Sequence, residues 1–199
     1  MSFKKFSGIL LVAAVLTAIV LVIFDGYWPA VFVNSNAISY KRFKEAYTAS
    51  IYYYRAGLKA TSQDTAVLES DEVQKELKRA VLDSLVEQKL IESELGKRML
   101  SGDLSRMIDE KMNRENLNSE NFKKGSELLY GLPVKEFKKI VLIPQVKREI
   151  LEGRFILVDS INNGQAGGFD TWLKNERIKA KVSVLLSGFY WGDGEMKMK

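Results

Sequence analysis

The chain of 199 residues contains no cysteine and no histidine. Without cysteine it has no disulfide, no thiol nucleophile and no thiolate metal ligand. Without histidine it lacks the most common acid–base catalyst and the most common metal ligand near neutral pH. We therefore predict that the protein is not an enzyme and that it uses no cofactor and no metal ion.

The chain also lacks a dense basic cluster, although it has 30 basic and 25 acidic residues and a net charge of +5. The two kinds of charge are interspersed, whereas a nucleic-acid groove usually concentrates basic side chains. No nucleic-acid partner is therefore predicted. Lys197 and Lys199 indicate a solubilising C-terminal tail over residues 188–199.

Three kinds of site that need no histidine have little support. The glycine-rich run 164–168 lacks the lysine and hydroxyl residue that follow a phosphate-binding loop, and it indicates a flexible loop. A serine–lysine hydrolase would need a specific pair, and no spacing singles one out. Asp103, Asp109 and Glu110 fit a solvated helix face better than a metal site.

An uncharged apolar run lies close to the start of the chain, within Phe6–Phe24. As a helix, the eighteen residues Ser7–Phe24 would reach roughly 27 Å, close to the hydrocarbon thickness of a bilayer. A buried core helix would normally keep one polar face, and this run has none. We therefore predict a transmembrane helix within residues 1–30.

The residues that follow the run favour a permanent anchor over a cleaved signal peptide. A cleavage site would show small residues in an Ala-x-Ala pattern, but Asp-Gly-Tyr-Trp-Pro follows instead. Tyr27 and Trp28 suit the aromatic belt of a membrane surface. Lys4 and Lys5 precede the run closely, which predicts an amino terminus in the cytoplasm and a domain on the periplasmic, extracytoplasmic side of the cytoplasmic (inner) membrane.

The remainder of the chain predicts a mainly α-helical domain over residues 31–187. Ser39 and Ser70 are suited to cap helices, and apolar residues at helical spacing follow Ser70 as far as about Arg98. Pro144 lies inside a later helical pattern, which it should kink or split.

Two β-prone segments flank the helices, at Val31–Val33 and Val182–Leu186. Because a lone strand is unstable, we predict that they pair as a small two-stranded element that joins the ends of the domain. Residues 159–168, rich in asparagine and glycine, are predicted to be a linker before the closing helix.

Several segments resemble one family. Val33–Ser39, with Phe43 four residues on, resembles the opening of the SurA/PpiD/PrsA-type N-terminal chaperone domain, in which Val-Asn-Gly is followed by Ile-Thr or Ile-Ser and a helix. Val81–Ile91 is similar to that family's second helix. Gly131–Pro133 before a long helix, and Trp172–Val182, resemble its later elements. The resemblance covers nearly all of the chain after the apolar run.

The chain departs from the family in two respects. Ser35 stands where the family often has glycine. The prolyl-isomerase (parvulin) domain is missing, since its active site typically uses paired histidines and residues 159–168 are too few to hold it. The resemblance therefore implies an anchored chaperone that binds non-native or newly exported polypeptides without ATP and without isomerase activity. The alternative is a structural or adaptor protein that binds one partner in an envelope or secretion complex; the sequence specifies no oligomeric state.

Two groups of side chains are candidates for polypeptide binding. They are three tyrosines and three methionines: Tyr52, Tyr53, Tyr54, Met99, Met107 and Met112. Three consecutive helical residues cannot share one face, so at least one tyrosine should be exposed, either at a binding surface or beside a core. Methionines adapt to varied partners, but at helical spacing they are more often core residues.

Overall fold

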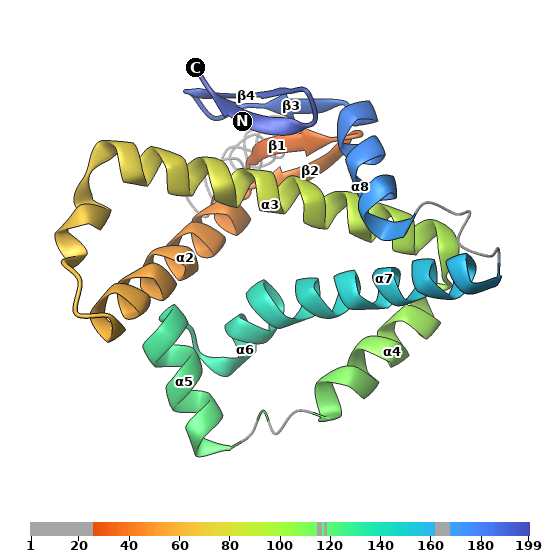
Figure 1. Cartoon of the computed structure of the whole chain (residues 1–199), viewed down its shortest axis with the longest axis horizontal. Coiled ribbons are helices and arrows are strands. Elements are labelled where there is room, and N and C mark those ends of the chain that lie inside the picture. Colours follow the sequence, from red (N-terminus) through yellow and green to blue (C-terminus); the bar gives the residue numbers. More distant parts are fainter. Residues whose placement is uncertain (1–25, 115–116, 118, 162–167) are drawn as a thin grey trace, which may run out of the picture.

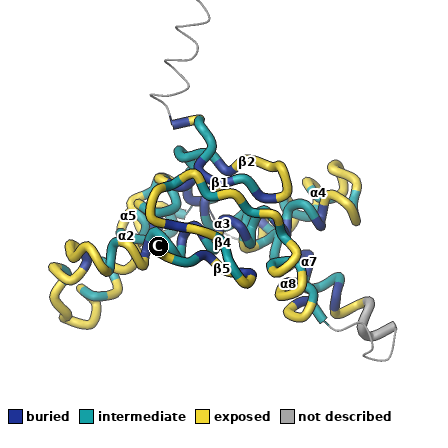
Figure 2. The backbone as a smooth tube through the Cα atoms, turned by 90° about the horizontal axis from the view of Figure 1, so that it is seen from above, coloured by how far each residue is buried: buried dark blue, intermediate teal, exposed yellow. Residues whose placement is uncertain are grey.

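The computed structural model describes residues 26–114, 117, 119–161 and 168–199. The fold is mainly α-helical, as predicted, and the long helix α3 (Asp71–Arg98) crosses its centre (Figure 1). Two small sheets cover one side of α3, while α7 (Ile143–Ile161) lies along the other. Figure 2 shows that buried residues gather in the middle of the molecule and exposed ones at its two outlying ends.

The remaining elements follow in chain order. They are β1 (Pro29–Val33), β2 (Asn36–Ser39), α2 (Tyr40–Ala60), η1 (Thr65–Glu69), α4 (Ser101–Arg114), α5 (Glu120–Tyr130), α6 (Val134–Phe137), the π-helical turn η2 (Lys138–Leu142), α8 (Gly168–Lys179), β3 (Val182–Val184), β4 (Phe189–Gly192) and β5 (Glu195–Met198). Residues 159–161 of the predicted linker belong to α7, and 162–167 lie outside the described residues.

Both serines predicted to cap helices do so. Ser39 Oγ accepts the backbone N–H of Arg42 at the start of α2, and Ser70 Oγ accepts that of Val73 at the start of α3. Each bond satisfies a donor that the first helical turn would otherwise leave unpaired. The helix α3 ends at Arg98, as its apolar spacing predicted.

The predicted pairing of the two β-prone segments is confirmed. Strands β1 and β3 are antiparallel, with Val31 opposite Val184 and Val33 opposite Val182. The element is larger than expected because β2 pairs with the other edge of β1, which gives the order β2-β1-β3. Asn34 and Ser35 join β1 to β2 with φ angles of 46° and 71°. Such left-handed residues are typical of a two-residue hairpin turn.

The C-terminal tail predicted for residues 188–199 is instead a β-hairpin, formed by β4 and β5. Phe189 and Met196 are 7% and 1% exposed and belong to the core between the strands and α3. Lys197 lies within β5, beside Asp193 of the hairpin turn. The burial of its apolar side chains makes the hairpin part of the folded domain.

Among the described residues, two core clusters divide α3 between them. The first half of α3 packs Leu82 and Val86 against the strands and α2. The second half packs Leu95 against α7 and α8, where Leu151 and Phe155 are buried. The helix α3 therefore holds together elements that are far apart in the sequence.

No helix of the described residues is both long and apolar enough to cross a bilayer. The apolar run predicted to do so, Phe6–Phe24, lies outside those residues.

Candidate binding groove

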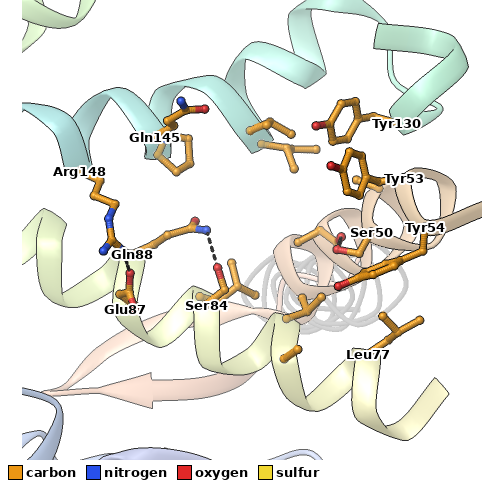
Figure 3. A pocket seen from close by; sticks show the side chains of 18 of the residues that line it. Ser50, Tyr53, Tyr54, Leu77, Ser84, Glu87, Gln88, Tyr130, Gln145 and Arg148 are labelled. Atoms are coloured by element: carbon orange, nitrogen blue, oxygen red, sulfur yellow. Dashed lines mark hydrogen bonds and ion pairs between the residues drawn. The ribbon is translucent and has the colours of Figure 1, made fainter. Parts of the chain in front are cut away.

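An open groove of about 480 Å³ lies between α2, α3 and α7, with the end of α5 at its rim (Figure 3). Most of its lining is uncharged. The small and polar residues of α2 and α3 that line it include Ala46, Ala49, Ser50, Ala80, Ser84 and Gln88. Positions three and four apart share one helix face, so each helix presents a continuous strip to the groove. These short side chains leave space that larger ones would fill.

Aromatic rings form one wall of the groove. Tyr53 stacks on Tyr130 with ring centroids 5.2 Å apart, and Tyr54 meets Tyr53 edge-on at 6.0 Å. Figure 3 shows Tyr53 and Tyr130 lying one above the other. Tyr53 and Tyr54 are each 50% exposed, so this wall offers apolar surface to solvent. Burial and, to a smaller extent, the neighbouring Tyr53 raise the pKa of Tyr130.

The charged side chains that line the groove pair with each other. Arg148 of α7 forms an ion pair with Glu87 of α3 (Figure 3). The Glu87 carboxylate also accepts a bond from Arg177 of α8 at 3.1 Å. Beside them, Gln88 donates to Ser84 Oγ at 3.2 Å. Because Glu87 and Arg148 compensate each other, the lining carries no net charge.

A π-helical turn interrupts the regular α-helical geometry of the predicted helix just before Pro144, where the helix borders the groove. Proline has no N–H, so it cannot donate to the carbonyl of Ile140 four residues earlier. The π-helical turn η2 precedes it, and Arg42 of α2 donates to the Ile140 carbonyl at 3.1 Å and to Gln88 Oε1 at 3.2 Å. Burial lowers the pKa of Arg42, against the opposing effect of Glu45 and Glu92. Arg42 thus ties α2, α3 and the turn before α7 together.

The structure separates the two predicted groups of binding residues. Tyr53 and Tyr54 line the groove, while Tyr52 packs over Gly131, where an added Cβ would lie 2.8 Å from the tyrosine ring. None of the three methionines lines the groove. Met99 and Met107 pack against the second core cluster, and Met112 is 9% exposed.

Several groove residues were not predicted from the sequence, among them Tyr130, Ala80 and Pro144. The sequence indicates Pro144 only as a helix breaker, and no local pattern distinguishes Tyr130 or Ala80. Among the described residues, no three acidic side chains are placed to hold a metal ion. Comparison of the chain with family models, with curated proteins and with solved structures finds no match.

Proposed function

We propose that this protein holds non-native or newly exported polypeptides at the outer face of the cytoplasmic membrane, without ATP. The predicted apolar anchor supplies the attachment, and the groove between α2, α3 and α7 supplies the contact. The proposal is supported by the sequence resemblance to the SurA/PpiD/PrsA-type chaperone domain and, above all, by the open groove, whose lining carries no net charge.

The chemistry of the groove suits weak binding of many sequences. Its volume of about 480 Å³ lies in the range of ligand pockets. Its rings and small side chains make non-directional contacts, and burial of one large apolar side chain contributes about 1.5–3 kcal/mol. Such contacts exchange readily, so a bound segment can leave without an energy source.

The test uses the full-length protein in lipid nanodiscs and several unrelated unfolded proteins whose aggregation is followed by light scattering. We expect the wild type to delay aggregation of each of them. The double substitution Tyr53→Ala/Tyr54→Ala should raise the concentration needed roughly tenfold, because it removes the exposed aromatic wall.

Tyr52→Ala is the matched control, since Tyr52 is 42% exposed but does not line the groove. It should suppress aggregation as well as the wild type. An adaptor would leave all the unfolded proteins unaffected and would yield a single crosslinked partner, and this result would overturn the proposal. If the Tyr52 variant and the Tyr53/Tyr54 variant suppress aggregation equally poorly, the groove is excluded as the binding site.

A further inference from the structure

The described chain begins with residues fixed to the start of α2. The carbonyl of Gly26 accepts the N–H of Lys41 at 2.7 Å, and the carbonyl of Trp28 accepts that of Tyr40 at 2.8 Å. The Trp28 and Tyr40 rings stack with centroids 4.5 Å apart and planes within 12°. Gly26 has a φ of +72°, and a Cβ there would lie 3.3 Å from Lys41 N. The first described residues are therefore part of the domain.

The fixed start of the chain allows little distance between the domain and the predicted anchor. A single residue, Asp25, separates Gly26 from Phe24, the last residue of the apolar run. One residue spans at most about 3.6 Å. If the run crosses the bilayer, the side chains around Gly26 lie at the level of the lipid headgroups. Figure 2 shows the described chain starting at an outer edge of the molecule, beside β2.

The side chains at this edge have the character of a membrane interface. Tyr27 is 55% exposed, and Lys41 Nζ donates to its hydroxyl at 3.1 Å and lies 4.7 Å from its ring centre. Lys44 is exposed one helical turn on and forms no ion pair with a described residue. Tyrosine and tryptophan concentrate at membrane interfaces, and lysine extends its ammonium group to the headgroups.

We propose that Tyr27, Trp28, Tyr40, Lys41 and Lys44 form a docking surface for acidic phospholipid headgroups. This inference rests on the anchor in the proposed function and adds a second contact with the membrane. The aromatic rings lie at the interface, and the two ammonium groups bind lipid phosphates. Each lysine near an anionic surface contributes about fivefold to binding. Two contacts fix the orientation of the domain, where a single tether would leave it free to rotate.

The absence of cysteine allows a single label in the full-length protein. A fluorophore on Thr48→Cys, exposed one turn beyond Lys44 on α2, reports on the docking surface, and one on Glu110→Cys of α4 is the control. Vesicles contain phosphatidylcholine with a spin-labelled headgroup, with or without phosphatidylglycerol. We expect the spin label to quench fluorescence at position 48 more strongly when phosphatidylglycerol is present, and to leave position 110 unchanged.

The double substitution Lys41→Gln/Lys44→Gln should abolish most of the effect of phosphatidylglycerol at position 48. Equal quenching at positions 48 and 110, or an unchanged effect in the double variant, would overturn the docking surface. Suppression of client aggregation should survive this substitution, so loss of docking alone leaves the holding function intact. Release of the wild type by an alkaline wash would instead disprove the anchor, and the docking surface with it.

Discussion

The two sides of α3 differ in how completely they are covered. Toward the sheets, Leu82 and Val86 are fully buried under strands from both ends of the domain. Toward α2 and α7, Ala80 and Ser84 line the open groove. One helix therefore supplies both a core and a binding surface. On the groove side, small residues such as Ala80 and Ser84 alternate with larger ones such as Leu77 and Val81 and leave space between them. Residues on the side that faces the sheets, the closed side, therefore stabilise the fold. Residues on the side that faces the groove, the open side, are available for binding.

Polar contacts complete the closed side. Asp83 accepts two bonds from Arg177, at 2.7 and 2.8 Å, and a third from the N–H of Met196 at 2.8 Å. Arg79 donates to the carbonyl of Met196 at 3.1 Å. Side chains of α3 thus occupy the edge of β5 where another strand would otherwise pair. Because these contacts take up the backbone groups of Met196, they disfavour pairing of this edge with a strand from another molecule.

The largest effect should come from Leu82→Ala on the closed side. Leu82 is 0% exposed, so the shorter side chain leaves a cavity and should lower the free energy of unfolding by about 3 kcal/mol. Urea unfolding followed by circular dichroism measures this loss. Leu128→Ala is the control, since Leu128 is 76% exposed and should change stability by less than about 0.5 kcal/mol. Similar losses in both variants would contradict the contrast between the two sides.

Asp83→Ala should have the next largest effect and lower the free energy of unfolding by about 2–3 kcal/mol. It removes the partner of Arg177, whose side chain is 17% exposed, and leaves the Met196 N–H without its acceptor. The control is Asp103→Ala, which breaks an exposed ion pair with Arg106 on α4 and should cost less than about 0.5 kcal/mol. If Asp83→Ala is no more costly than its control, the hairpin is not held by this network.

The closed side was partly predictable from the sequence. Ser70 and the apolar spacing that follows it specified α3, because caps and helical periodicity are local signals. The pairing of β1 with β3 followed from the instability of a lone strand. The hairpin at the end of the chain was missed, although Asp193-Gly194 between short strands is a common hairpin turn and both residues have positive φ. Lys197 and Lys199 favour a solvated tail in the sequence, whereas in the structure Lys197 pairs with Asp193 within the hairpin.

The groove could not have been predicted in the same way. Its lining comes from α2, α3, α5 and α7, and small residues such as Ala49 and Ala80 become a cavity wall only when distant segments meet. Tyr52, Tyr53 and Tyr54 were all predicted to be candidates, because three adjacent aromatic residues on a helix cannot share one face. Which of the three would face the groove depended on Gly131, whose bare backbone accommodates Tyr52.

Arg42→Ala tests the contacts that tie α2 to α3 and to the turn before α7. It should lower the free energy of unfolding by about 1–2 kcal/mol. The substitution leaves the Ile140 carbonyl without the donor that replaces the N–H missing from Pro144. Pro144→Ala supplies a backbone N–H at that position, so the Arg42 substitution should cost less in its presence. A double-mutant cycle on urea unfolding measures the coupling, expected to be about 1 kcal/mol. Additive losses would mean that Arg42 does not compensate for the proline.

Glu94→Gln should have a smaller, pH-dependent effect at the second core cluster. Burial raises the pKa of Glu94, but bonds from Arg98 at 2.6 Å and Lys97 at 3.2 Å outweigh it and hold the pKa below its ordinary value of 4.5. Because the pKa of Glu94 is lower in the folded protein than in the unfolded chain, its ionised carboxylate stabilises the folded protein above pH 4.5. This stabilisation is lost as the pH falls through the folded-state pKa. The free energy of unfolding of the wild type should therefore exceed that of the variant by about 1 kcal/mol at neutral pH. The two values should converge in acid. Parallel stability profiles from urea unfolding across this range would contradict the assignment.

The smallest change in stability should come from Ala80→Leu, which adds volume on the open side of α3. The new side chain extends into existing space, so the free energy of unfolding should change by less than about 0.5 kcal/mol. Val86→Leu is the matched control on the closed side, where Val86 is 0% exposed and extra volume should cost about 1–3 kcal/mol. Ala80→Leu should nevertheless weaken the suppression of client aggregation, because it fills the groove. Equal destabilisation by the two substitutions would show that the side facing α2 and α7 is packed as tightly as the core.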